Sequence, residues 1–179
     1  MTDLDPRLQE LLDRQALHDL AITYARAIDR RDRELLLGVY HDDAIDDHGT
    51  MFTGDPVRYA DWQPEVMAPF EITNHYIMNT AYRLDGDRAE GEVHFIAYHR
   101  THGPEVREIW VGGRYLDRYE RRAGQWKIAH RTLIWDFTRN EIANPEDTAF
   151  RQSLGVSGGG ADDAAEQVLP LFRRQSPTA

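Results

Sequence analysis

Apolar residues near the N-terminus recur at the spacing of a helix. Asp5-Pro6 suits the start of this helix, because a carboxylate caps free backbone N–H groups and proline fits the first helical position. One apolar stripe then follows, made of Leu8, Leu11, Leu12, Leu17, Leu20, Ala21, Tyr24, Ala25 and Ile28. We expect the helix to end near Arg30-Arg31 and Asp32 to cap a second, short helix. The two helices form a hairpin with Asp29 at its inner corner.

The pattern changes to strands after Phe70. Residues 41–49 predict a short strand, and the stretch from Asp55-Pro56 to Asp61-Trp62 predicts one or two short helices. Residues 72–85, 88–102, 106–122 and 125–140 are rich in aromatic and β-branched residues and predict four long strands. The strands are separated by hairpin-type turn signals, namely Asp85-Gly86-Asp87, His102-Gly103-Pro104 and Arg122-Ala123-Gly124.

Helices followed by a long antiparallel meander indicate an α+β fold. A strongly curved antiparallel sheet wrapped around the N-terminal helices gives a cone-shaped α+β barrel that is open at one end. We expect residues 1–145 to form this cone as one domain, and residues 146–179 to form a C-terminal tail. Within the tail, Gly158-Gly159-Gly160 predicts a linker and residues 161–174 a helix, which could act as a lid, contact a partner subunit or remain disordered.

Charge and composition limit the classes of partner. The formal net charge is −10, from 31 acidic and 21 basic side chains, and no basic stripe is present, so we expect no nucleic-acid partner. No apolar stretch approaches the length that crosses a bilayer, and the acidic N-terminus lacks the basic start of a secretory signal. We therefore expect a cytoplasmic protein with no membrane partner. The lack of cysteine excludes disulfides and cysteine nucleophiles.

The segment from His41 to His48 is rich in Asp and His, which are residues that bind cations. No HExxH motif, calcium-binding loop or second ligand cluster accompanies it, and a solvated acidic strand and loop explains the composition. No Gly-rich phosphate loop follows a strand either. We expect no metal and no cofactor.

Several local segments resemble one family. Tyr24 to Asp32 looks like the end of the first helix in SnoaL-like proteins of the nuclear transport factor 2-like superfamily, and Tyr40 to Ala44 resembles the segment that follows it there. Asn74-His75 sits early in the first long strand, where several enzymes of the group have a histidine. Residues 113–121 and 124–128 resemble the last hairpin of the group. Together these segments cover about residues 10–140.

The resemblance implies an Asp–His pair in one deep pocket of the cone. Scytalone dehydratase, bile acid 7α-dehydratase and hexachlorocyclohexane dehydrochlorinase are members with such a pair, which Asp29 and His75 match. Arg131 matches an arginine that the dehydrochlorinase places near its leaving group. Tyr24 matches a tyrosine of the bile acid enzyme, whereas the dehydrochlorinase has a lysine there. This departure favours loss of water over loss of halide.

Elementary chemistry supports the same pair. Histidine is suited to remove a proton from carbon at neutral pH, and a carboxylate at its other nitrogen fixes the reactive tautomer. The alternative is that Asp29 caps its helix or pairs with a neighbouring arginine, and that His75 is an ordinary strand histidine. Spacing alone favours this structural alternative.

Strand alternation and helix spacing add further candidates. From His75, the same face of the strand should carry Thr73, Ile77, Asn79 and Ala81; on the last long strand Ala129, Arg131, Leu133 and Trp135 should share a face. A buried Arg131 needs an anionic partner such as Asp29, or it stabilises developing negative charge; a structural salt bridge is the alternative.

Tyr24 lies about one turn from Asp29 and could protonate a leaving hydroxide, or it is a core tyrosine.

Aromatic residues are expected to wall the pocket for a flat ring, although such residues more often belong to the core. The candidates for this wall are Trp62, Phe70, Tyr98, Trp110 and Trp135.

The resemblance implies a cofactor-independent lyase of the dehydratase type that acts on a small, apolar, cyclic hydroxylated substrate. The alternatives are an isomerase or cyclase that uses the same base, and a non-catalytic ligand-binding or interaction subunit with the same cone. Because curved sheets of this kind pair through their outer faces, we expect a homodimer or homotrimer.

Overall fold

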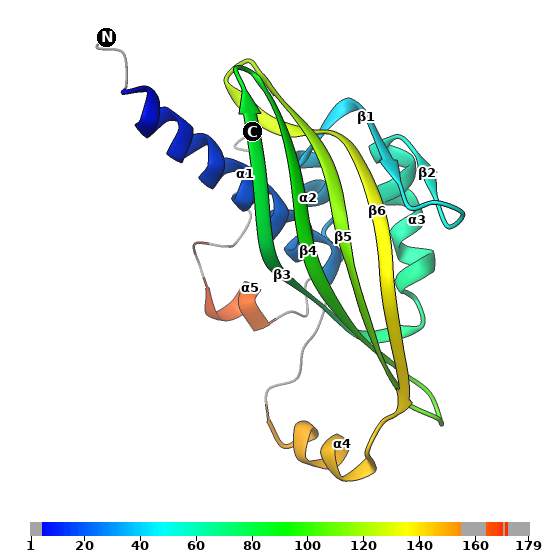
Figure 1. Cartoon of the computed structure of the whole chain (residues 1–179). Helices are drawn as coiled ribbons and strands as arrows, with labels where there is room; N and C mark the ends of the chain where they lie inside the picture. Colours follow the sequence, from blue (N-terminus) through cyan, green and yellow to red (C-terminus); the bar gives the residue numbers. More distant parts are fainter. Residues whose placement is uncertain (1–4, 155–163, 170, 172–179) are drawn as a thin grey trace, which may run out of the picture.

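The computed structural model describes residues 5–154, 164–169 and 171. The elements follow the predicted order, with helices before the long strands (Figure 1). The helices are α1 (Pro6–Asp29), α2 (Arg33–Gly38), α3 (Pro56–Met67), α4 (Pro145–Gln152) and α5 (Ala164–Val168). The strands are β1 (Tyr40–Asp47), β2 (Thr53–Gly54), β3 (Phe70–Asp85), β4 (Arg88–Thr101), β5 (Arg107–Arg122) and β6 (Gln125–Ile142).

The N-terminal helices begin where the capping residues predict. The side chain of Asp5 accepts a hydrogen bond from the backbone N–H of Arg7, and that of Asp32 accepts one from Leu35 at 2.9 Å. Asp29 is the last residue of α1, so the hairpin of α1 and α2 has Asp29 at its corner. This places a carboxylate at the point where the first helix meets the sheet.

The strands form one sheet in the order β2-β1-β6-β5-β4-β3. Neighbouring strands are antiparallel except for β1 and β6, which are parallel. The three long hairpins turn at Gly86, Gly103 and Gly124, which have φ angles of +59°, +111° and +79°. Because β2 and β3 are the two edges, the sheet is curved but does not close into a complete barrel.

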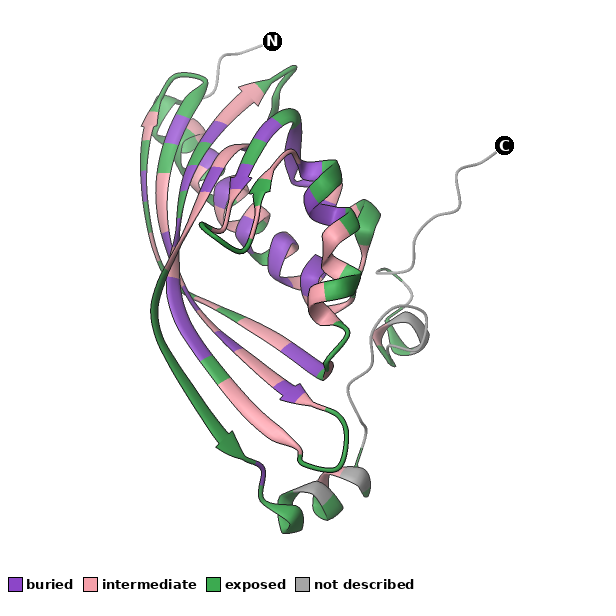
Figure 2. Cartoon of the chain, turned by 90° about the vertical axis from the view of Figure 1, so that its right-hand side faces the viewer, coloured by how far each residue is buried: buried purple, intermediate pink, exposed green. Residues whose placement is uncertain are grey.

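The curved sheet has a concave face toward α1, α2 and α3 and a convex face toward solvent (Figure 2). Residues directly opposite each other on neighbouring strands share a face. His75 lies opposite Ala97, and Ala97 lies opposite Val111, on the concave face. Tyr98 lies opposite Trp110, one position further along, and both therefore belong to the convex face.

A β-bulge in β3 changes which side chains accompany His75. The pairing register shifts just before Thr80, which lies opposite the fully buried Val93 and so faces the helices. Strict alternation from His75 predicts Asn79 and Ala81 on that face instead. This prediction is wrong, because the bulge inserts an extra residue and reverses the alternation beyond it.

A second bulge affects the start of β6. Ile128 is fully buried opposite Tyr119, and the register shifts before the next pair. Ile128 therefore faces the helices, and the prediction that Ala129 shares a face with Arg131 is wrong. Arg131 and Trp135, which follow the bulge, share the concave face as predicted.

The C-terminal segment contains one helix that the sequence pattern did not predict. Asn144 caps α4 through a hydrogen bond from the backbone N–H of Glu146, and Arg151 forms an ion pair with Glu71 at 2.9 Å. The short α5 falls within the predicted helix 161–174, whereas the remainder of that helix and the Gly158–Gly160 linker lie outside the described residues.

No helix in the described part of the chain is both long enough and apolar enough to cross a bilayer.

A buried carboxylate fixes the orientation of α1 against the sheet. Asp13 is 7% exposed and accepts hydrogen bonds from Trp126 Nε1 at 2.8 Å, Arg121 Nη1 at 2.7 Å and Gln9 Nε2 at 3.0 Å. Trp126 and Arg121 belong to the hairpin of β5 and β6. Hydrogen bonds to a buried charged group are stronger than those between neutral groups, so this contact sets the direction in which α1 delivers Asp29.

We expect Asp13→Ala to lower the free energy of unfolding by about 2 kcal/mol, because the buried indole N–H would lose its acceptor. Urea denaturation followed by circular dichroism measures the change. Asp19→Ala is the matched control on the same helix, since Asp19 is exposed and accepts only from Gln15. Equal losses in the two variants would contradict this role of Asp13.

Candidate active site

The structure brings Asp29 and His75 into contact through two hydrogen bonds. Oδ1 of Asp29 lies 2.7 Å from Nδ1 of His75, and Oδ2 accepts a hydrogen bond from the backbone N–H of His75 at 2.8 Å. Because β3 is an edge strand, it has no neighbouring strand on one side. The bond to Oδ2 of Asp29 therefore gives the backbone N–H of His75 an acceptor that a neighbouring strand does not supply. One carboxylate therefore holds both the backbone and the imidazole of His75.

This arrangement leaves the other ring nitrogen available. With Nδ1–H donated to Asp29, Nε2 of His75 carries the lone pair, and within the described residues it has no hydrogen-bond partner. The side chains of His75 and Asp29 are 9% and 10% exposed, so the pair is mostly shielded from water but still reachable. An imidazole held in this orientation can remove a proton through its second nitrogen.

A second histidine, His99, faces the same region and was missed by the sequence analysis. Its ring centroid lies 5.6 Å from that of His75 and 4.7 Å from that of Phe70. Burial, helped by the adjacent His75, lowers the pKa of His99 to about 4, so its ring is neutral at physiological pH. Its Nδ1 is buried and has no partner within the described residues. A neutral imidazole there can bind a polar substrate atom.

Tyr24 lies deeper in the cone and ends a line of polar contacts. Its hydroxyl lies 2.6 Å from that of Tyr59, whose hydroxyl lies 3.4 Å from Nε2 of His48. Nδ1 of His48 lies 2.5 Å from Asp46, which also accepts a 2.5 Å hydrogen bond from Tyr40. Burial raises the pKa of Tyr24 well above its usual value, so this phenol keeps its proton.

Arg131 is fully buried, and its anionic partner is Asp117 instead of the expected Asp29. Asp117 lies directly opposite Arg131 on β5 and receives two hydrogen bonds from the guanidinium, at 2.8 and 2.7 Å. The guanidinium is stacked between Tyr24 and Tyr115, 4.1 and 4.0 Å from the ring centroids. Only Nη1 has no partner within the described residues. Arg131 thus faces inward, and its ion pair with Asp117 is the structural salt bridge that was the alternative, whereas the pairing with Asp29 is not found.

The structure separates the aromatic residues expected to wall the pocket. Phe70 packs against His99 with the two rings tilted by 31°, and Trp135 lies on the concave face opposite Gly113, where it is 48% exposed. Trp62, on α3, stacks on Phe52 with a centroid distance of 5.3 Å and packs against the core.

Tyr98 and Trp110 lie on the convex face, so the prediction that they wall the pocket is wrong. From the turn at Gly86, uninterrupted pairing would place Tyr98 opposite His75; the bulge in β3 places Ala97 there instead. Along β4, whose pairing with β5 has no register shift, Ala97 and His99 share the concave face and Tyr98 lies on the convex face.

Within the part of the chain that the structure describes, no group of three or more His, Asp or Glu side chains is arranged to hold a metal ion. The acidic segment from His41 to His48 instead forms β1 and the start of the following loop. In this segment Asp46 and His48 contact each other.

Comparisons with known proteins agree with this architecture. The model of the SnoaL-like domain family matches residues 9–132. The uncharacterized protein Rv2910c of Mycobacterium tuberculosis is 27% identical over 124 residues, which are 68% of this chain and 84% of that protein.

Two solved structures show the shared fold. A LinA-type3 hexachlorocyclohexane dehydrochlorinase from Novosphingobium barchaimii is 21% identical with a TM-score of 0.68, over 78% of this chain and 99% of that chain. A proposed scytalone dehydratase from Novosphingobium aromaticivorans is 19% identical with a TM-score of 0.65, over 84% of this chain and 93% of that chain. With a family model that spans more than half of its length, this chain belongs to the SnoaL-like domain family.

Proposed function

We propose that this protein is a cofactor-independent lyase that removes water from a small, apolar, cyclic hydroxylated substrate. The observation that carries the proposal is the Asp29–His75 pair, in which Asp29 holds Nδ1 and Nε2 remains available. The fold that this chain shares with a dehydrochlorinase and a proposed scytalone dehydratase supports an elimination reaction.

His75 is the general base in this proposal. Its Nε2 takes a proton from a carbon that a neighbouring carbonyl makes acidic, a carbon–carbon double bond forms, and the carbon–oxygen bond to the hydroxyl group breaks. Asp29 stabilises the imidazolium that results and keeps the ring in position. The apolar side chains of the concave face would hold the ring of the substrate, and Phe70 and Trp135 are the two predicted wall residues of the long strands that lie on that face.

Tyr24 is the proposed acid for the departing hydroxide. A proton from its hydroxyl turns the hydroxide into water, and the contacts to Tyr59 and then His48 offer a route by which the proton is replaced. His75 gains one proton from the substrate and Tyr24 donates one to the hydroxide. The protein therefore gains no proton overall, and the net reaction releases one water molecule. The high pKa of Tyr24 is consistent with a role as donor rather than base.

Arg131 acts through Tyr24 in this proposal. Its charge is neutralised by Asp117, and its guanidinium covers the ring of Tyr24 at 4.1 Å. A cation on the face of the ring holds the phenol in place and stabilises the phenolate that forms when the proton leaves. His99, which stays neutral, is placed to hydrogen-bond the carbonyl oxygen of the substrate.

An isomerase or cyclase is the second candidate. Tyr24 is only 2% exposed, which restricts direct access of a leaving group to its hydroxyl. An enzyme that uses only the more accessible His75 would move a proton between carbons or close a ring without expelling water.

Mass spectrometry of hydroxylated polyketide, steroid and terpene ketones incubated in deuterated buffer tests the base. We expect loss of water with the wild type, no reaction with His75→Ala, and a decrease in kcat of about 100-fold or more with Asp29→Asn. His94→Ala is the matched control, because His94 lies on the convex face. Normal turnover by His75→Ala would refute the proposal. Deuterium uptake without loss of water would favour the isomerase or cyclase.

The proposed acid is tested by separating proton abstraction from loss of water. We expect Tyr24→Phe to retain deuterium uptake into the substrate but to lower the rate of water loss at least about tenfold, because the ring remains and only the donor is removed. Tyr59→Phe should give a smaller loss of the same kind. Tyr98→Phe, on the convex face, is the control. Equal losses of deuterium uptake and elimination in Tyr24→Phe would show that Tyr24 is only structural.

The buried neutral His99 should make the fold sensitive to acid. The pKa of His99 rises from about 4 in the folded chain to about 6.5 after unfolding, so the unfolded state binds more protons between these values. Stability is therefore lost as the pH falls from 6.5 to 4, by up to about 3 kcal/mol. Urea denaturation at pH 7 and pH 4 should show a smaller loss in His99→Gln. The exposed-turn variant His102→Gln should keep the wild-type loss, and an unchanged loss in His99→Gln would contradict the assignment.

A further inference from the structure

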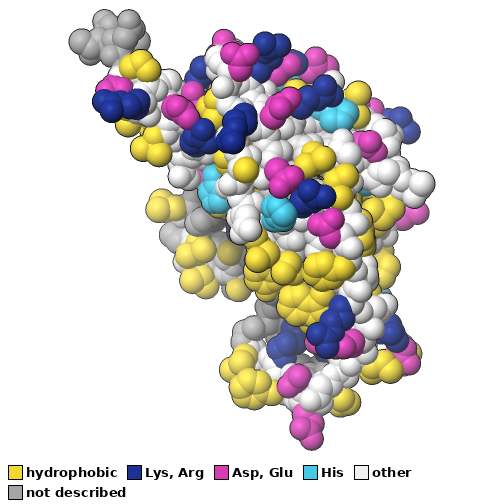
Figure 3. Space-filling view, viewed as in Figure 1, with side chains coloured by type: hydrophobic (Ala, Val, Ile, Leu, Met, Phe, Trp, Pro, Cys, Tyr) yellow, Lys and Arg dark blue, Asp and Glu magenta, His cyan; other side chains and the backbone are white. Residues whose placement is uncertain are grey.

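The helices α1, α2 and α3 enclose a cleft that lies outside the candidate active site. The cavity has a volume of about 270 Å³, which is near the lower end of the range for small-molecule sites. Asp29, His75 and His99 do not line it, so the proposed reaction does not use it. The three helices lie on the concave side of the sheet (Figure 2), opposite the hydrophobic side chains that gather on the convex face in Figure 3. The apolar walls of the cleft are Ala27, Ile28, Leu36, Ala60, Pro64 and Met67.

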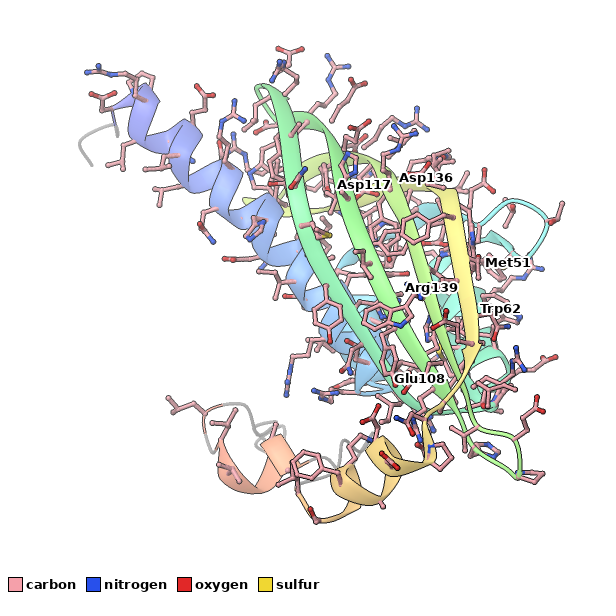
Figure 4. The ribbon with its side chains drawn as sticks, turned by 60° about the horizontal axis from the view of Figure 1, so that its bottom comes forward. Met51, Trp62, Glu108, Asp117, Asp136 and Arg139 are labelled. Atoms are coloured by element: carbon pink, nitrogen blue, oxygen red, sulfur yellow. The ribbon has the colours of Figure 1, made fainter. Side chains whose placement is uncertain are left out.

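The walls of the cleft are already formed by the packing of the helices. The wall residues from α3 share one face of that helix, because they recur at positions 60, 64 and 67. Trp62 lies on another face of α3, on the side of the molecule where Met51 lies and away from α1 (Figure 4). A ligand in the cleft would therefore meet a fixed apolar surface. Four of the wall residues are exposed by 3% or less and belong to the hydrophobic core, namely Ala27, Ile28, Leu36 and Ala60.

Four charged residues also line the cleft, and three of them have printed roles in holding the helices together. Asp32 caps α2 by accepting a hydrogen bond from the backbone N–H of Leu35. Arg33 forms an ion pair with Asp61 at 2.9 Å, which links α2 to α3. Arg31 has no carboxylate partner within the described residues. Arg31 therefore brings an uncompensated positive charge to the cleft.

The backbone at Arg31 fixes where this charge lies. Its φ angle is +54°, which is in the left-handed region where glycine is favoured at the end of a helix. Its N–H donates a hydrogen bond to the carbonyl oxygen of Ile28 at 3.1 Å, and Nη2 donates one to the carbonyl oxygen of Phe70 at 2.5 Å. The guanidinium is thus anchored through one nitrogen, and the others have no partner within the described residues. An arginine at a position that favours glycine points to a role for its side chain.

An apolar wall with one guanidinium beside it fits an apolar molecule that ends in a carboxylate. A carboxylate can accept two parallel N–H hydrogen bonds from one guanidinium. Because the chain carries a net charge of −10, most of its surface repels an anion, and an uncompensated cation attracts one locally. Arg31 would repel an ammonium ligand, and a neutral ligand would leave the guanidinium without a counter-charge.

We propose that the cleft between α1, α2 and α3 binds a small monocarboxylate with an apolar body. The carboxylate pairs with Arg31, and the apolar body packs on Ile28, Leu36 and Ala60. Because Ile28 directly precedes Asp29, a ligand in the cleft would contact the turn of α1 that carries the carboxylate of the candidate active site. Binding in the cleft does not depend on the proposed reaction at His75.

Isothermal titration calorimetry of the full chain with phenylbutyrate measures this binding. We expect a dissociation constant of about 1 mM or lower, and an affinity at least about tenfold lower for the neutral phenylbutyramide or for Arg31→Gln, because each lacks one partner of the charged pair. Arg7→Gln is the matched control, since Arg7 is 93% exposed at the start of α1 and does not line the cleft. His75→Ala should keep the wild-type affinity. Circular dichroism checks that each variant is folded.

Methyl-labelled methionine shows where the ligand binds. Met67 lines the cleft, whereas Met51 follows β1 and Met78 belongs to β3. We expect the phenyl ring of phenylbutyrate to shift the NMR signal of the Met67 methyl group and to leave those of Met51 and Met78 unchanged. Met67→Leu assigns the signal. An unchanged Met67 signal, or equal affinities of Arg31→Gln and the wild type, would overturn the proposal. Loss of binding in His75→Ala would place the ligand beside the Asp29–His75 pair and overturn it as well.

Discussion

The two hydrogen bonds from Asp29 to His75 determine how the helices, the sheet and the chemistry of this protein fit together. An edge strand leaves backbone N–H groups without strand partners, and a helix that ends against such a strand can place a side chain there. Asp29 is that side chain: one oxygen accepts the N–H of His75 and the other fixes its ring. The position of His75 is therefore set by the same contact that joins the end of α1 to β3.

The charged residues on the concave side fall into two groups. One is a buried cluster around Asp117 and Arg131, and the other is the group of Asp29, His75 and His99. Asp117, Arg131, Asp46 and the tyrosines around them are almost completely buried, and hydrogen bonds and stacking connect them, although Nη1 of Arg131 and Oδ1 of Asp46 have no hydrogen-bond partner within the described residues. Breaking one member of such a cluster leaves an uncompensated buried charge, so the cluster is held in a single arrangement. Asp29, His75 and His99 lie outside this cluster, where Nε2 of His75 stays reachable. Rigid surroundings and one available nitrogen are the conditions that proton abstraction needs.

Much of the fold could be predicted from the sequence, because its signals are local. Capping residues and apolar spacing located α1 and α2, and turn glycines located the four long strands. The resemblance to a family, more than spacing, selected Asp29 and His75. The predictions that were wrong concern which face of the sheet individual strand residues occupy. A bulge depends on packing between strands and leaves no clear local signal, yet the bulge in β3 puts Thr80, instead of Asn79, on the face that His75 occupies. Likewise, the partner of Arg131 is Asp117, which only the pairing of β5 with β6 reveals.

Two Asp–His pairs in one small domain show why residue type alone does not identify a base. In both pairs a carboxylate lies within 2.7 Å of Nδ1, and both histidine side chains are 9% exposed. Nε2 of His48, however, faces the hydroxyl of Tyr59, and the carboxylate of Asp46 is completely buried and shared with Tyr40. That imidazole already has neighbours on both sides, so it is suited to pass a proton along the line toward Tyr24. The imidazole of His75 has a carboxylate on one side, and within the described residues its Nε2 has no hydrogen-bond partner. This difference at the second nitrogen is the reason for which the proposed reaction assigns the base to His75 and not to His48.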